Sequence, residues 1–139
     1  GQGEYRVCVA SAEPTTGLRD SIPVGATLSL KAGSGAQVLL AWEEPERLHR
    51  GLIDASFTAT TLSEVRRRGW AQSVGEREPG VASVSAPVRG VDGRVIAALS
   101  VSGPIERMGR QPGRLYGPAV VAAANRLTDF LRTAEEMGL

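Results

Sequence analysis

The strongest constraint on the fold is a pair of apolar segments, residues 81–88 and 94–102, that flank the tetrapeptide GVDG. Both segments are rich in valine, which is typical of β-strands. An Asp-Gly pair between two such segments is a strong short-range signal for a β-hairpin. If Asp-Gly at 92–93 forms a two-residue turn, Val91 pairs with Arg94. That pairing predicts the register of the whole hairpin.

The predicted register gathers four serines on one face of the hairpin. Ser85 is expected to lie opposite Ser100, and Ser83 opposite Ser102. Because side chains alternate between the two faces of a strand, all four hydroxyls project to the same side. The other face is apolar and is the expected core face, formed by Val84, Ala86, Val88, Ala97, Leu99 and Val101.

Two interpretations of the serine face remain open. In the first interpretation the serines are exposed to solvent, because antiparallel sheets often have one polar face in contact with water. However, Pro87, Ile96 and Ala98 continue the same face, and these side chains are poorly suited to open water. A small, partly apolar face with hydroxyls is typical of the floor of a covered pocket.

Further strands are expected at 5–11 and 70–74, with a short extended segment at 21–30 that Pro23 and Gly25 interrupt. Strands mixed with helices in this order predict an α+β fold in which helices cover an antiparallel sheet. No repeat or second domain is evident, so residues 1–139 are expected to form a single domain.

Helices are expected where capping residues precede helix-forming segments. Ser34 is the expected N-cap of the first helix, and Thr60 or Thr61 that of the third. The expected ranges are 33–42, 45–52 and 60–69.

The C-terminal tail is expected to form one amphipathic helix after a loop at 103–114. Apolar side chains recur there at steps of three and four residues, which places them on one face of a helix. The expected buried face consists of Tyr116, Val120, Ala123, Leu127, Phe130 and Ala134.

The composition is that of a soluble globular domain. Of the 139 residues, 42% are hydrophobic and 22% are charged, and the formal net charge is +1. This nearly neutral charge does not indicate a surface that binds nucleic acid. No segment is long and apolar enough for a membrane helix, the first residues lack a signal-peptide pattern, and a single cysteine fits a reducing compartment. The cytoplasm is therefore the expected location.

No catalytic or metal-binding pattern is present, so neither an enzyme nor a cofactor is expected. His49 lies in a polar helical segment and is expected at the surface, and Cys8 lies among valines and is expected to be a buried thiol. No set of Cys, His, Asp and Glu has the spacing of metal ligands. Residues 76–78 (Glu-Arg-Glu) either contact a ligand or form a solvated loop, and the loop is the favoured interpretation. The arginines at 66–68 fit the C-terminus of a helix.

Two longer segments resemble a known family. The sequence GWAQSVGEREPGVASVSAPVRGVDGRVIAALSVSGP (69–104) is similar to the C-terminal effector-binding domain of IclR-type bacterial transcription regulators. The segment VCVASAEPTTGLRDSIPVGATLSLKAGSGAQVLLAW (7–42) agrees with the preceding part of that domain. The resemblance extends from about residue 5 to residue 133.

The resemblance implies a GAF-like or profilin-like fold with an antiparallel sheet of about six strands. It also implies that the domain binds a small effector, often an organic acid or an aromatic compound, and thereby modulates DNA binding. Family members self-associate as dimers or tetramers and contact operator DNA through an N-terminal winged helix-turn-helix. No such pattern precedes Tyr5, so that domain is expected to be absent from this chain. The alternative is a GAF-like dimerisation or interaction module without a small ligand.

The resemblance also implies where a ligand is held. Amides at a helix N-terminus favour an anion, and serine hydroxyls both donate and accept hydrogen bonds. By position, the expected contacts are the backbone amides of Gly33 and Ser34 and the side chains of Ser73, Ser83, Ser100 and Ser102.

The chain departs from the family pattern near this site. Ser73 replaces a frequent aspartate, while Lys31 and Gln37 stand where the family usually has histidine and lysine. These departures put the best-known small-acid ligands of the family in doubt.

Overall fold

A computed structural model describes residues 5–11, 22 and 24–139 of the chain. Within these residues the strands form two antiparallel sheets, one of two strands and one with the order β3-β4-β5. The elements are β1 (Tyr5–Val7), β2 (Thr27–Ser29), α1 (Ser34–Ala41), α2 (Pro45–Leu52), α3 (Ala59–Arg68), β3 (Ala71–Val74), β4 (Val81–Arg89), β5 (Val95–Pro104), α4 (Ile105–Met108) and α5 (Pro112–Glu136).

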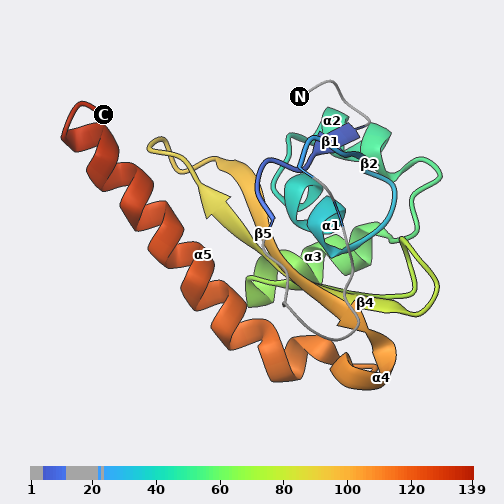
Figure 1. Ribbon diagram of the computed structural model, residues 1–139. Coiled ribbons are helices and arrows are strands. Elements are labelled where there is room, and N and C mark those ends of the chain that lie inside the picture. The colour runs from blue at the N-terminus through green and yellow to red at the C-terminus, as the bar shows by residue number, and fades with distance from the viewer. Residues whose placement is uncertain (1–4, 12–21, 23) are drawn as a thin grey trace.

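Helices cover both faces of the three-stranded sheet. Helix α1 packs on one face with α3 behind it, and the long α5 crosses the other face diagonally (Figure 1). The α+β class and the antiparallel strands are as expected. The described residues contribute five strands in two sheets, where a single sheet of about six was expected.

The hairpin has the predicted register beside the serines. Ser83 lies opposite Ser102, and Ser85 lies opposite Ser100. The turn itself was predicted wrongly, because Val91 does not pair with Arg94. Instead the amide of Gly90 donates to the carbonyl of Arg94.

A bulge compensates for the different turn. The loop has three residues, 91–93, and Gly93 adopts a φ of 83°, which glycine tolerates best. Arg89 then pairs with Val95 while Val88 pairs with Ala97, which leaves Ile96 as the extra residue of a β-bulge. The longer turn shifts the pairing by one residue and the bulge shifts it back. The serines therefore keep the predicted partners.

The face opposite the serines is the core face. Val84, Ala86 and Val88 are almost completely buried and pack with Val120 and Ala124 of α5. Ala97 and Leu99 of β5 border this cluster as expected. Val101 is the exception among the predicted core residues, since 37% of it is exposed.

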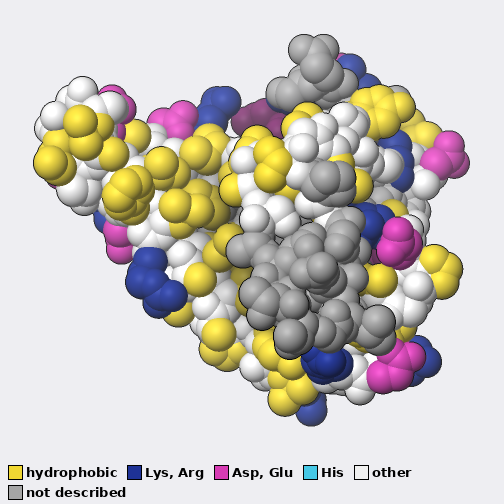
Figure 2. All heavy atoms as spheres, in the orientation of Figure 1, with side chains coloured by type: hydrophobic (Ala, Val, Ile, Leu, Met, Phe, Trp, Pro, Cys, Tyr) yellow, Lys and Arg dark blue, Asp and Glu magenta, His cyan; other side chains and the backbone are white. Residues whose placement is uncertain are grey.

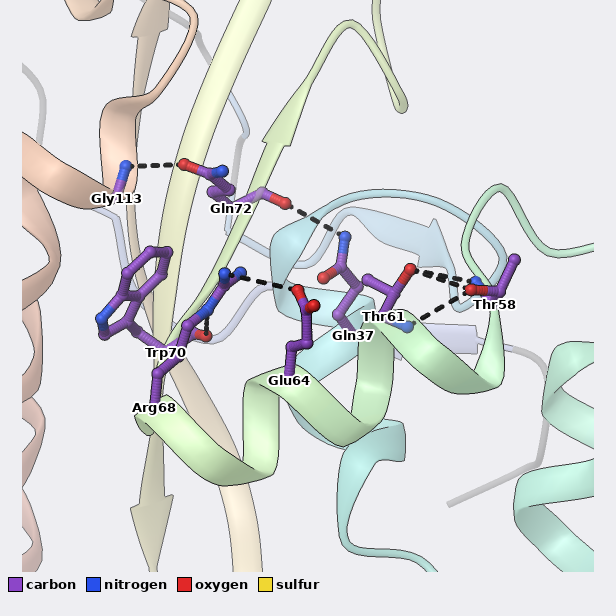
Figure 3. A network of polar contacts seen from close by, with 8 residues as sticks. All are labelled: Gln37, Thr58, Thr61, Glu64, Arg68, Trp70, Gln72 and Gly113. Atoms are coloured by element: carbon purple, nitrogen blue, oxygen red, sulfur yellow. Dashed lines mark hydrogen bonds and ion pairs between the residues drawn. The ribbon is translucent and has the colours of Figure 1, made fainter.

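Helix α5 packs on the sheet partly through the predicted apolar stripe, because Val120 is buried and Tyr116 packs beside it, and partly through small residues. Gly113 and Gly117 lie against the indole ring of Trp70, and a Cβ at Gly113 would come within 2.0 Å of that ring (Figure 3). The predicted face is therefore correct at Val120 and wrong at Leu127 and Phe130. Leu127 and Phe130 are 39% and 66% exposed, and hydrophobic side chains gather along the outer half of α5 (Figure 2).

The helix starts differ from the predictions in two places. Ser34 is the first residue of α1, and Gly33 is its N-cap, with a φ of 98° and no side-chain cap. Helix α3 starts earlier than predicted, because Thr58 and Thr61 form its capping box (Figure 3). Helix α2 has the predicted bounds, and the short α4 lies in the segment expected to be a loop.

Two side chains weighed as possible catalysts lie outside the core. His49 is exposed on α2, as expected. Cys8 is only half-buried and follows the end of β1, so its prediction as a buried core thiol is wrong. No helix in the described part of the chain is long and apolar enough to span a membrane.

Candidate functional site

Five serine hydroxyls form a continuous chain of hydrogen bonds beneath the start of α1. Ser73 of β3 contacts Ser83 of β4 at 2.7 Å, and Ser83 contacts Ser34 of α1 at 2.6 Å. Ser34 also lies 2.7 Å from Ser85, which in turn contacts Ser100 of β5 at 2.5 Å. The chain of hydroxyls thus joins three strands to the first residue of α1.

The serine face is covered over β3 and β4 and open to solvent along β5, where Ser100 and Ile96 are exposed. Ser85, Ser34 and Ser73 are 0%, 1% and 6% exposed, because α1 packs over them. Ser83 is half-buried, and Ser100 at the end of the chain of hydroxyls is exposed. The buried hydroxyls satisfy one another, which removes the cost of desolvating them. Only the outer serines remain accessible to another molecule.

The backbone amides at the start of α1 are partly occupied by the protein itself. The amide of Gly33 donates to Glu76 Oε1 at 3.0 Å, and the amide of Ser34 donates to Ser73 Oγ at 3.2 Å. The next two amides, of Gly35 and Ala36, donate no hydrogen bond to any residue that the structure describes. Ala36 is completely buried in the core, whereas Gly35 borders the site, so the amide of Gly35 is the one that can face a ligand.

Glu76 connects the loop 75–80 to α1. Its Oε2 accepts a hydrogen bond of 3.0 Å from Gln37 Nε2, and burial raises the pKa of its carboxyl group. The favoured prediction of a solvated loop is thus wrong at this residue. Gln37 also donates to the carbonyl of Gln72, whose side chain accepts from the amide of Gly113 at the start of α5 (Figure 3). A line of polar contacts therefore links the site to α5.

The stability of the fold is expected to depend on pH through Glu76. Burial raises its pKa above the unfolded value, so the ionised form is penalised in the folded chain. The penalty is present above the folded-state pKa and is lost as the pH falls below the unfolded-state pKa. As the pH is lowered from about 7 to about 4, the free energy of unfolding of the wild type should therefore rise relative to that of Glu76→Gln.

Urea denaturation of both proteins at several pH values measures this difference. Glu106→Gln serves as the control for the change in charge, because Glu106 is exposed on α4. If the free energies of unfolding of the wild type and Glu76→Gln changed by the same amount with pH, the raised pKa of Glu76 would be contradicted.

A small hollow of about 50 Å³ opens beside the start of α1. Two cationic side chains, Arg6 and Arg77, contribute to its wall. Such a volume accommodates a small polar group rather than a whole metabolite. Five of the six residues predicted to contact a ligand line this hollow, namely Gly33, Ser34, Ser83, Ser100 and Ser102.

The sixth predicted residue, Ser73, lies behind the hollow and supports it. Its hydroxyl accepts from the amide of Ser34 and contacts the hydroxyl of Ser83. A second, larger hollow shares Arg6, Ser100 and Ser102 with the small one and continues along β5. The two hollows together form the candidate site.

Sequence reasoning missed Arg6. The alternation of β1 places Arg6 on the inner side, while the flanking Tyr5 and Val7 are each 58% exposed. This pattern is the reverse of the usual one, so hydrophobicity gave no signal for it. Arg6 donates to the carbonyls of Ser29 at 3.2 Å and Ala32 at 3.0 Å.

A family model matches most of the chain. Residues 2–129 match the model described as "Bacterial transcriptional regulator IclR C-terminal". The matched range includes both sheets, the chain of serine hydroxyls and most of α5.

Two curated relatives are also transcription regulators. The HTH-type transcriptional regulator BhcR of Paracoccus denitrificans is 30% identical over 98% of this chain and 53% of its own length. The transcriptional repressor IclR of Escherichia coli is 29% identical over 80% of this chain and 45% of its own length. The chain therefore spans about half the length of these relatives.

Solved structures share the fold. A protein of Rhodococcus sp. RHA1, described as a transcriptional regulator, superposes with a TM-score of 0.85 at 25% identity. The match covers 95% of this chain and 59% of that one. The IclR protein of Thermotoga maritima superposes with a TM-score of 0.82 at 19% identity, over 95% of this chain and 59% of that one.

Proposed function

Because the chain belongs to the family of C-terminal domains of IclR-type bacterial transcriptional regulators, we propose that it is the effector-sensing part of a longer regulator. The family consists of regulators rather than enzymes, in agreement with the sequence analysis. The fold is the GAF-like or profilin-like α+β fold that the resemblance implied. On this proposal, a small metabolite binds in the candidate site and changes the affinity of the full-length protein for DNA.

The observation that carries the proposal is the convergence of the predicted contacts on one hollow. Gly33, Ser34, Ser83, Ser100 and Ser102 come from α1 with its N-cap, β4 and β5, yet they line the same space. The amide of Gly35, which has no acceptor among the described residues, and the outer serine hydroxyls supply donors at its wall. Concave sites with a few convergent polar groups are typical of ligand pockets.

Binding alone does not regulate, because the ligand must favour one conformation over another. Glu76 offers one route, since it holds the loop 75–80 to the helix end that borders the hollow. Gln72 offers another, since it connects Gln37 of α1 to Gly113 of α5. On this proposal, a ligand at the start of α1 alters these contacts and thereby the position of α5.

The properties of the whole regulator are part of the same proposal. Operator DNA is contacted by an N-terminal winged helix-turn-helix in the full-length protein, which acts in the cytoplasm without a membrane partner. Self-association as a dimer or tetramer completes the regulator. Sedimentation of the full-length protein with and without ligand measures this last property.

Thermal shift screening with a library of organic acids and aromatic compounds tests the proposal. A compound that binds the folded chain raises its melting temperature. Calorimetry should then show about tenfold weaker binding or worse to Ser100→Ala/Ser102→Ala, because each lost hydrogen bond contributes about 1 kcal/mol. The matched control is Ser63→Ala on the exposed side of α3, which should bind like the wild type.

Equal binding to the wild type and the double variant would place the site elsewhere. The second candidate function, an interaction module without a small ligand, is favoured by the exposed Leu127 and Phe130 on α5. It predicts that no compound of the library raises the melting temperature, whereas assembly depends on protein concentration.

A further inference from the structure

We propose that Arg6 determines specificity in the candidate site, because its guanidinium makes the site prefer an anion over an uncharged compound of the same shape. The inference rests on the proposed function, because it concerns the same site. It names a specificity-determining residue that neither the sequence pattern nor the family match points to.

The charge of Arg6 lacks a counter-ion within the described part of the chain. The partly buried guanidinium donates only to the backbone carbonyls of Ser29 and Ala32, and no described carboxylate pairs with it. Burial and the neighbouring guanidinium of Arg77 lower the pKa of Arg6 to about 10, so it remains charged at neutral pH. An ion that is desolvated without a partner is costly, and a bound anion removes that cost.

The acidic group at this end of α1 does not neutralise the hollow. Glu76 directs one oxygen to the amide of Gly33 and the other to Gln37. Neither contact involves Arg6, although Arg6 Nη2 lies 3.0 Å from the position that a Cβ on Gly33 would occupy. Arg77 also borders the hollow but pairs with Glu78 at 3.9 Å, so the charge that the inference depends on is that of Arg6.

Several donors converge next to Gly35. A Cβ there would lie 2.2 Å from Arg6 Nη1 and 3.6 Å from Ser100 Oγ, so only glycine leaves the guanidinium this close to the helix. The amide of Gly35, without a described acceptor, belongs to the same residue. A guanidinium, a hydroxyl and an amide together match the acceptor geometry of a carboxylate.

The neighbouring space determines the rest of the ligand. The small hollow of about 50 Å³ holds little more than the carboxylate itself. The larger hollow begins at Arg6 and Ser100 and is bordered by apolar side chains that include Leu28, Ile96 and Ala98. A ligand that occupies both hollows has an anionic end and an apolar body.

Matched pairs of acids and amides test the selectivity. Benzoate and benzamide have the same shape and differ in charge, as do hexanoate and hexanamide. Calorimetry on the 139-residue chain should show binding of at least one of the two acids, about tenfold or more tighter than its amide. The same acid should bind about tenfold or more weakly to Arg6→Gln. Arg94→Gln, which removes an equal charge from the exposed hairpin turn, should bind it like the wild type.

The outcomes separate this inference from the proposed function. Equal binding of acid and amide to the wild type, or of the acid to the wild type and Arg6→Gln, overturns the role of Arg6. If neutral compounds of the library still bind through Ser100 and Ser102, the proposed function stands while this inference fails. Binding of neither acid also overturns it. The acid-to-amide comparison needs no variant, and Arg6→Lys retains the charge if Arg6→Gln fails to fold.

Discussion

Replacing Gly113 by alanine is expected to destabilise the fold by about 3 kcal/mol, although alanine is the better helix former. Gly113 lies in the first turn of α5, where the helix crosses the indole ring of Trp70. A Cβ at this position would lie 2.0 Å from Cζ3, 2.3 Å from Cη2 and 2.7 Å from Cε3 of the ring. The guanidinium carbon of Arg68 lies 3.8 Å from the centroid of the ring, so a shift of the ring also disturbs that stacking.

Urea denaturation measures the effect, and a double-mutant cycle identifies its cause. In the background Trp70→Leu, the change Gly113→Ala should be close to neutral, because the clash is gone. Equal stability of Gly113→Ala and the wild type would contradict the close packing of α5 on Trp70. A cost that persists without the ring would assign it to another contact.

Replacing Leu62 by alanine is expected to cost between about 2 and about 5 kcal/mol. Leu62 belongs to α3, is 0% exposed and is among the largest completely buried side chains. It packs in the cluster that includes Ala36 and Val38 of α1. The substitution removes apolar contacts and leaves a cavity beneath the helix that carries Ser34.

The matched control is Leu115→Ala, since Leu115 on α5 is 69% exposed. That change should alter the free energy of unfolding by less than about 0.5 kcal/mol. Similar losses in the two variants, measured by urea denaturation, would contradict the assignment of the core between α1 and α3.

The sequence pattern predicted the strand pairing of the hairpin correctly beside the serines, but not the length of its turn. The partners of Ser83 and Ser85 were correct because alternation and the apolar face fix the register of β4 and β5. The number of residues in the turn was wrong, and only the bulge at Ile96 restored the pairing. The position of a bulge cannot be predicted from the alternation of side chains, because that prediction assumes one residue opposite one residue along the whole pair of strands.

Hydrophobicity predicted only part of the buried face of α5. Val120 is buried as expected, but the helix also contacts the core through Gly113, Gly117 and Ala124, which are small, and the two glycines allow the close approach to Trp70. Larger side chains of the predicted face, such as Leu127 and Phe130, remain exposed. Close packing through glycine and alanine has no signal in a pattern of apolar side chains.

The candidate site was only partly predictable. The hairpin register and the family resemblance located the serines and the start of α1, which the structure brings together. The positions of Arg6 and Glu76 depend on tertiary structure, since each contacts a segment more than 20 residues away in the sequence. Likewise, the burial of the serine face depends on α1, which packs on β4 and β5. The sequence pattern of the strands does not determine where that helix packs.

The most direct test is a titration of the ¹⁵N-labelled chain with a ligand, either benzoate or a compound from the screen, followed by NMR. The account predicts that the amide signal of Gly35 and the side-chain Nε signal of Arg6 shift together and saturate at one ligand concentration. Saturable shifts that leave these two signals unchanged, for example shifts confined to the outer half of α5, would contradict it.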